Sequence, residues 1–281
     1  MDRIKESVIF LLAIVLAALC IPALSAQKTG SAPATKGTPL EVAAPAWQTG
    51  DYWATFDGGL LVDFADLARF RDADLRLGPP AAGENRVVFL GDSITQGWNL
   101  QEFFPGKPYV NRGISGQTSS QMLLRFRQDA IDLNPKAVVI LAGTNDLAEN
   151  TGPVTLKQVE GNLMSMAQLA KANGIGVVLC SVLPSVRYGW HPELKNPAPR
   201  IVALNAWIKA YATGGGYAYV DYYSAMADSA GGLPHKLSLD GVHPLAAGYA
   251  LMAPLAQAGI EKTLNDEGSH PRPGTKHLKK P

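Results

Sequence analysis

The chain has 281 residues, of which 47% are hydrophobic and 17% charged, and its formal net charge is +1 at pH 7. This is enough apolar material for one sizeable core, and too little charge for a disordered protein or one that coats nucleic acid. A net charge near zero also gives no long-range attraction to anionic membranes or polynucleotides. We therefore expect one catalytic-size domain with no nucleic-acid partner.

Residues 1–26 have the order of a secretory signal peptide. Two basic residues precede an apolar run over residues 8–24, and small residues follow up to Ala26. We expect cleavage after Ala26, export to the periplasm or the medium, and no stable membrane insertion afterwards. Two alternatives stay open. An apolar run of about 17 residues is the lower limit for an uncleaved spanning helix, and Cys20 is an alternative point of lipid attachment.

Removal of that leader would leave Cys180 as the only cysteine. It lies in the apolar run 177–180, so we expect a buried and inert thiol rather than a nucleophile. Without a second cysteine the fold must be held by its core, since no intramolecular disulfide can form.

Residues 27–45 are rich in Ala, Pro, Thr, Gly and Lys without periodicity, and they predict a flexible linker. Residues 266–281 predict a disordered basic tail. Next to the linker we expect an outer helix around Leu60–Leu75 and three aromatic packing anchors, which are Trp47, Tyr52 and Trp53.

Short apolar, β-branched runs alternate with longer helical segments through the rest of the chain. The runs predict strands at Val87–Leu90, Tyr109–Val110 (the weakest), Ala137–Leu141, Val177–Val182 and Tyr217–Val220. The helical segments are Ser119–Leu133, Leu156–Asn173, Arg200–Tyr211 and Pro244–Leu264. Strands that are apolar throughout need cover on both faces. The pattern therefore predicts an α/β fold, a three-layer α/β/α sandwich around a five-stranded parallel sheet.

Four polar segments containing glycine fall at strand ends or just before the last helix. They are Gly91–Thr95, Asn111–Thr118, Gly143–Asp146 and Asp240–Pro244. Ligands of such sheets bind beyond the carboxyl ends of the strands. We therefore expect these segments to converge on one site.

The residue types in these segments suit acyl transfer. A serine hydroxyl is a weak nucleophile unless a base removes its proton and a third group orients the base. Ser93, His243 and Asp240 can fill these roles, although Ser93 taken alone could simply cap a helix. Donors for the developing oxyanion are the N–H groups of Ser93 and Gly116 and the side-chain amide of Asn145.

Together the four segments resemble the signature blocks of the SGNH (GDSL-type) hydrolases, over about residues 86–264. The resemblance implies a flavodoxin-like sheet for a hydrolase domain at 46–265, no metal and no organic cofactor. It also implies Ser93 as nucleophile, Gly116 and Asn145 as oxyanion donors, and Asp240 with His243 as the rest of the triad. The G-x-S-x-G elbow of ordinary α/β-hydrolases is absent.

Other residues in the same segments suggest structural roles. Asp92 and Asp146 are expected to support the site by holding loops or capping helices rather than by donating protons. Gly91, Gly113 and Gly143 are expected at turns or close contacts.

A proline-rich loop after the fourth predicted strand carries Tyr188, Trp190 and His191, which are candidates for lining the acyl or leaving-group pocket. For His191 and His235 a surface or groove-lining role is favoured over a role in the chemistry, since neither has metal-ligand spacing to another His, Cys or acid. Tyr222 and Tyr223 are candidates for the opposite rim.

These features predict an exported serine esterase that acts on a small-molecule or glycan ester. Because no long apolar insertion resembles a lipid-binding lid, short acyl groups such as acetyl on carbohydrates are favoured. The family resemblance, to lysophospholipase-like and carbohydrate-acetylesterase-like members alike, leaves lysophospholipase, thioesterase and O-acyltransferase activities open. A non-catalytic carbohydrate-binding module on the same fold is the alternative from a different class, and the complete triad argues against it.

Overall fold

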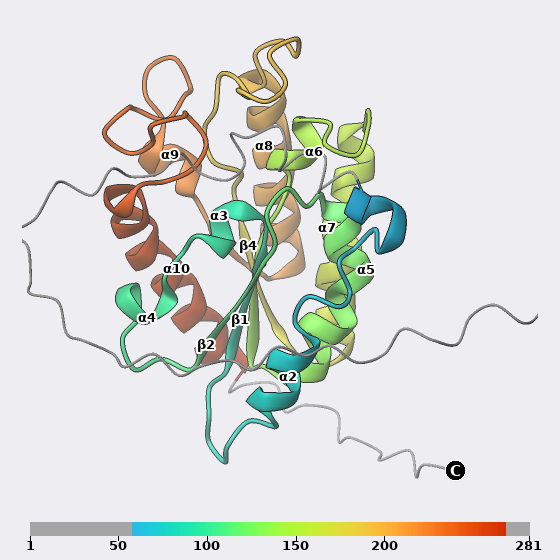
Figure 1. Cartoon of the computed structure of the whole chain (residues 1–281). Coiled ribbons are helices and arrows are strands. Elements are labelled where there is room, and N and C mark those ends of the chain that lie inside the picture. The colour runs from blue at the N-terminus through green and yellow to red at the C-terminus, as the bar shows by residue number, and fades with distance from the viewer. Residues whose placement is uncertain (1–57, 268–281) are drawn as a thin grey trace, which may run out of the picture. The chain divides into compact units, whose positions relative to one another are not determined.

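The structure, a computed structural model, describes residues 58–267 (Figure 1). The expected signal peptide (1–26), the linker (27–45), the aromatic anchors before residue 58 and the tail beyond Glu267 lie outside the described residues. Within residues 58–267, no helix is both long enough and apolar enough to cross a membrane.

A five-stranded parallel sheet forms the centre, with the strand order β2-β1-β3-β4-β5. Its strands are β1 (Val87–Gly91), β2 (Tyr109–Gly113), β3 (Ala137–Leu141), β4 (Gly176–Cys180) and β5 (Ala218–Val220). This is the flavodoxin-like order. The predicted fold class is therefore confirmed.

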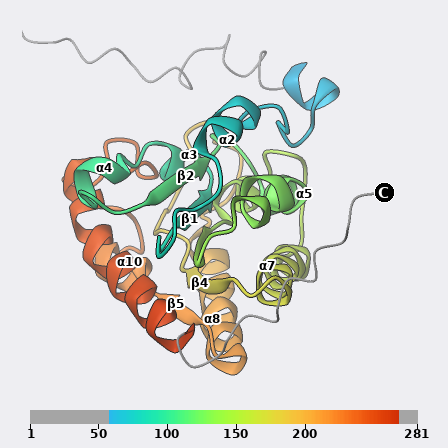
Figure 2. The same ribbon diagram turned by 90° about the horizontal axis from the view of Figure 1, so that it is seen from below.

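Helices cover both faces of the sheet, as Figure 2 shows from below. One face packs against α5 (Ser119–Asp129), α7 (Leu156–Ala172) and α8 (Ala198–Gly215), and the other against α10 (Ala246–Glu267). The shorter helices are α2 (Arg71–Leu77), α3 (Ser93–Gln96), α4 (Leu100–Phe103), α6 (Thr144–Leu147) and α9 (Tyr222–Met226), with a 3-10 turn, η2, at Ile131–Leu133.

Alternate side chains of each strand enter the two cores. In β1, Val88 and Leu90 join the core under α5, α7 and α8, while Val87 and Phe89 join the core under α10. Side chains that alternate between two buried faces give a strand that is apolar at every position. This is why the strand predictions, which relied on continuous apolar runs, succeed.

The edge strand β2 is longer than the predicted Tyr109–Val110 and continues to Gly113. Its last residues are polar because an edge strand borders loops as well as core. The Asn111 amide donates to the carbonyls of Thr95 and Trp98, and Arg112 pairs with Asp74.

The predicted strand at Val177–Val182 ends earlier, at Cys180. The side chain of Asn205 in α8 explains this end, since its amide nitrogen donates to Val182 O while its oxygen accepts the Val182 N–H. Cys180 is buried as expected, and burial raises the pKa of its thiol to about 12. His235 is exposed, in agreement with its expected surface role.

The helix expected at Leu60–Leu75 is wrong. The chain makes one helical turn over residues 58–62, then turns, and α2 begins only at Arg71. Asp66 has a positive φ of 52°, which a continuous helix excludes. Glutamine side chains around α5 bind the carbonyls that such a helix would use, and these carbonyls belong to Phe64, Ala65 and Leu67.

Gly113 and Gly91 are close-packing glycines, as expected. A Cβ atom at Gly113 would lie 2.1 Å from the backbone nitrogen of Gln96, and one at Gly91 would lie 2.9 Å from Leu141 O. The backbone of α3 therefore lies directly against the end of β2.

We expect Gly113→Ala to destabilise the protein by about 3 kcal/mol or more, because backbone atoms of α3 must move to admit the methyl group. Gly161→Ala is the matched control. Gly161 lies inside α7, and a Cβ atom added there would have no heavy atom within 4 Å, so alanine should stabilise the helix by about 0.5–1 kcal/mol. Urea denaturation of both variants tests the prediction. A free energy of unfolding for Gly113→Ala equal to that of Gly161→Ala or of the wild type would contradict it.

Candidate active site

Ser93, His243 and Asp240 form a continuous chain of hydrogen bonds. Ser93 Oγ lies 2.8 Å from His243 Nε2, and His243 Nδ1 lies 2.7 Å from Asp240 Oδ2. An ionised carboxylate accepts only, so the Nδ1 atom carries the proton and Nε2 is the acceptor of the Ser93 hydroxyl. Residues 150 positions apart are thus brought into the arrangement that activates a serine.

The loop before α10 holds Asp240 through further hydrogen-bond donors. Its Oδ1 atom accepts the N–H groups of Val242 and His243 and the hydroxyl of Ser238. Burial alone would raise the pKa of the Asp240 carboxyl, but the side-chain and backbone hydrogen bonds from His243 outweigh it and the pKa lies well below its ordinary value. The carboxylate therefore stays ionised beside the imidazole.

Asp92 and Asp146 are buried carboxylates that accept hydrogen bonds from backbone N–H groups. Asp92 accepts the Ile94 N–H at 2.9 Å at the start of α3. Asp146 accepts both the N–H and the hydroxyl of Ser119, at 2.8 and 2.5 Å, at the start of α5. Burial raises the pKa of both groups, that of Asp92 to about 6.

The glycine loop after β2 lies between Ser93 and Asn145. The N–H groups of Ser93 and Gly116 have no acceptor among residues 58–267, and Gly116 has a φ of +78°, which favours glycine. The Asn145 amide donates to Gln117 O at 3.0 Å and makes a longer contact of 3.4 Å to Asp92 Oδ2. The three expected oxyanion donors therefore follow three neighbouring strands, with Ser93 at the start of α3, Gly116 in the loop after β2 and Asn145 in α6.

Asn150 is a site residue that sequence reasoning missed. Its amide nitrogen donates to Gly116 O at 3.1 Å and to Asn145 Oδ1 at 3.0 Å, and its oxygen accepts the Trp190 indole N–H at 2.9 Å. The contact to Asn145 Oδ1 orients that amide so that its nitrogen faces Gln117. In the sequence, the only indication of this role was that Asn150 is a second asparagine five positions after Asn145.

The loop after β4 places its three expected pocket residues differently. The Trp190 ring lies 6.2 Å from the His243 ring, centre to centre, and is half-buried. Tyr188 is buried beneath Trp190 and supports it rather than lining a pocket. His191 pairs with Glu193 at 3.0 Å. Of the expected opposite rim, Tyr222 is fully buried and Tyr223 half-buried.

Among residues 58–267, no group of three or more His, Cys, Asp or Glu side chains is placed to hold a metal ion.

Residues 89–251 match the model of a family described as GDSL-like lipase/acylhydrolase. Two curated relatives are each 30% identical to this chain. The esterase TesA of Pseudomonas aeruginosa aligns over 59% of this chain and 78% of its own length. An uncharacterized lipoprotein of Bacillus subtilis, YqeF, aligns over 37% of this chain, which spans about half (51%) of that relative.

Two solved structures have a similar fold. A GDSL-like lipase from Bacteroides thetaiotaomicron is 46% identical, with a TM-score of 0.69 over 71% of this chain and 99% of that one. A mutant of an acetyl-xylooligosaccharide esterase from Geobacillus stearothermophilus is 25% identical, with a TM-score of 0.54 over 63% of this chain and 94% of that one.

The raised pKa of Asp92 predicts a pH-dependent loss of stability. Below about pH 4 the carboxyl is protonated in the folded and unfolded chains alike and costs nothing. Between about pH 4 and 6 the unfolded chain loses this proton first, so a pKa raised from 3.8 to about 6 lowers the free energy of unfolding by up to about 3 kcal/mol.

Asp92→Asn lacks this titration. Relative to the wild type, we expect its free energy of unfolding in urea to rise by about 2 kcal/mol from pH 4 to pH 7. Glu84→Gln is the control. Hydrogen bonds from the Ala81 N–H and the Arg86 side chain lower the pKa of Glu84, so the free energy of unfolding of this variant relative to the wild type should not rise over the same range. A constant difference for Asp92→Asn would rule out the raised pKa.

Proposed function

The chain belongs to the GDSL-like lipase/acylhydrolase family and is a carboxylic ester hydrolase, and we propose that Ser93, His243 and Asp240 form its catalytic triad. The observation that carries this proposal is the hydrogen-bond chain from Ser93 Oγ through the imidazole to the Asp240 carboxylate. An imidazole that carries its proton on Nδ1 can accept the hydroxyl proton of Ser93 at Nε2 as the serine oxygen attacks the substrate.

The reaction has two halves. Ser93 Oγ bonds to the ester carbonyl carbon while His243 Nε2 takes the hydroxyl proton, and the carbonyl π electrons move to its oxygen. When this oxyanion collapses, the bond to the alcohol oxygen breaks and His243 returns the proton to the leaving group. Water then attacks the acyl-enzyme through the same base, which releases the acid and restores Ser93.

The oxyanion is held by the N–H groups of Ser93 and Gly116 and by the Asn145 amide. The absence of another acceptor for these two N–H groups in the described residues supports their assignment as oxyanion donors. Asn145 keeps its 3.0 Å bond to Gln117 O and exchanges the longer Asp92 contact for the oxyanion. Donors preorganised in this way stabilise charge that exists only in the transition state.

The favoured substrate carries a short acyl group, such as acetyl, on a small molecule or a glycan. The Trp190 ring lies next to the His243 ring, and its indole N–H donates to Asn150. The ring is therefore held in place and borders the acyl group at the reacting carbonyl. The similarity to an acetyl-xylooligosaccharide esterase supports the same substrate class.

The same protein is proposed to be exported. The basic, apolar and small-residue order of residues 1–26 supports this, and one relative is named a lipoprotein.

Ser93→Ala should lower kcat for p-nitrophenyl acetate by at least about a thousandfold without unfolding the protein, since no other group replaces the nucleophile. A fluorophosphonate probe should label the wild type at Ser93. Ser120→Ala, which removes a hydroxyl bonded to Thr118 at the start of α5, is the control and should keep wild-type kcat. Wild-type activity in Ser93→Ala would refute the triad.

Trp190→Ala should raise the ratio of kcat/KM for butyrate over acetate esters by about tenfold, because one or two extra methylenes change affinity on this scale. Trp190→Phe separates bulk from hydrogen bonding. It keeps the ring but loses the bond to Asn150, so its rates should fall for both esters while the ratio stays at the wild-type value. An unchanged ratio in Trp190→Ala would remove Trp190 from acyl selection.

A further inference from the structure

Helix α5 buries polar side chains and exposes an apolar one. Gln121, Arg125 and Asp129 recur every four residues and are buried, whereas Leu124 is 61% exposed. A helix on the surface of a soluble domain normally has the reverse pattern. The polar face is covered by the preceding segment 64–67, whose carbonyl groups accept the glutamine amides.

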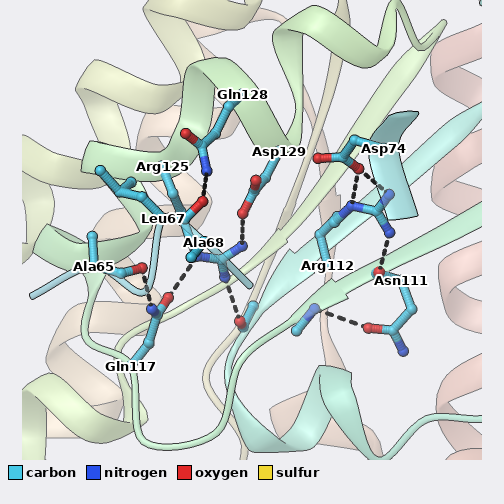
Figure 3. Close-up of polar contacts among 12 residues, drawn as sticks. Ala65, Leu67, Ala68, Asp74, Asn111, Arg112, Gln117, Arg125, Gln128 and Asp129 are labelled. Carbon is cyan, nitrogen blue, oxygen red and sulfur yellow. Dashed lines mark hydrogen bonds and ion pairs between the residues drawn. The ribbon is translucent and has the colours of Figure 1, made fainter. Parts of the chain in front are cut away.

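Arg125 is the centre of this buried polar face. Figure 3 shows its guanidinium donating in three directions. Nε donates to Gln117 Oε1 at 2.5 Å, Nη1 to Asp129 Oδ2 at 3.0 Å, and Nη2 to the carbonyl of Gly91 at 3.0 Å. Burying an ion pair costs several kcal/mol in desolvation, which the attraction offsets only in part. The pair therefore contributes little net stability. The contacts of Arg125 with Gln117 and Gly91 need a separate explanation.

The other two acceptors belong to the loops of the proposed site. Gly91 ends β1 two residues before Ser93, and its carbonyl also accepts the Ile114 N–H at 3.0 Å. Gln117 directly follows Gly116, and its carbonyl accepts the Asn145 amide. The Arg125 side chain thus connects the Gly91 carbonyl, two residues before Ser93, with the side chain of Gln117, which follows Gly116 and accepts the Asn145 amide at its own carbonyl.

We propose that Arg125 is a positioning residue that acts through Gln117 and Gly91 to set the spacing of the oxyanion donors. This inference rests on the proposed function. A guanidinium is a planar fork with fixed angles between its donors, unlike the flexible ammonium of lysine. Catalytic groups tolerate displacements of only about 0.5 Å. Loss of the fork should therefore weaken binding of the transition state and leave ground-state binding unchanged.

A second buried arginine offers a matched control. Arg112 at the end of β2 donates to Asp74 and to the Asn111 carbonyl (Figure 3). Its guanidinium also lies 4.7 Å from the centre of the Phe70 ring. Its hydrogen bonds in the described part of the chain go to these groups rather than to Gly91 or Gln117. Like Arg125 it is buried and forms an ion pair, although its partner Asp74 is 18% exposed, and it does not bond to Gly91 or Gln117.

The test compares three changes in the full chain. Gln117→Met removes the acceptor and keeps the Arg125–Asp129 pair. Arg125→Met combined with Asp129→Asn removes both charges together, so that no lone charge stays buried. Arg112→Met with Asp74→Asn is the control for an ion pair. Gln128→Met is the control for anchoring the segment, since it removes the bond to Leu67 O and leaves Gln117 and the Gly91 carbonyl bonded to Arg125.

For p-nitrophenyl acetate we expect kcat to fall about tenfold to a hundredfold in the Gln117 and Arg125 variants, with KM within about threefold of wild type. The pH dependence of kcat should keep its midpoint, because the hydrogen bonds among Ser93, His243 and Asp240 are untouched. Both controls should keep kcat within about threefold, even where the unfolding temperature falls.

The inference is overturned if Gln117→Met keeps wild-type kcat, if the loss appears in KM, if the pH midpoint moves, or if either control loses as much kcat. Should the Arg125 double variant fail to fold, Gln117→Met decides the matter alone. Ser93→Ala is measured beside them. Activity in that variant would refute the triad itself, whereas an inactive Ser93→Ala with full activity in Gln117→Met would refute only the role of Arg125.

Discussion

The register of β1 against its two neighbours is the constraint on which the site depends. Gly91 is paired with Gly113 in β2 and with Leu141 in β3, so the loops that carry Ser93, Gly116 and Asn145 leave the sheet at one level. Parallel strands bring their carboxyl ends to the same edge. The missing side chain of Gly113 lets the backbone of α3 approach that edge directly, and the missing side chain of Gly91 leaves room for the Thr95 side chain.

Beyond the strand ends, side chains take over the role of the sheet in pairing the backbone. A loop has no ladder of hydrogen bonds, and buried backbone groups left unpaired are costly. Asn150 accordingly binds Gly116 O, Asn145 binds Gln117 O, and Asp240 binds the N–H groups of its own loop. The loops are therefore ordered by specific polar contacts, and the N–H groups of Ser93 and Gly116, within the described residues, are left for another acceptor.

Family membership settles the reaction class, and the geometry of these loops supports the roles proposed within it. An aromatic neighbour of the proposed base is Trp190, whose indole is also bonded to Asn150. The proposed selection of the acyl group and the proposed support of the oxyanion donors thus involve one contact, the hydrogen bond between Trp190 and Asn150. Arg125 connects the same donors to the interior of the domain.

The sequence by itself determined the parallel sheet and the main helices, because apolar runs and their periodicity are local properties of the chain, and its resemblance to a family supplied the residues of the proposed triad. It failed at Leu60–Leu75, where a helix was expected but distant glutamines bind the carbonyl groups. It also left Arg125 and Asn150 unnoticed, although both contact the site loops. Only the tertiary structure decided these points, since whether a polar face is solvated or buried depends on which remote segment covers it.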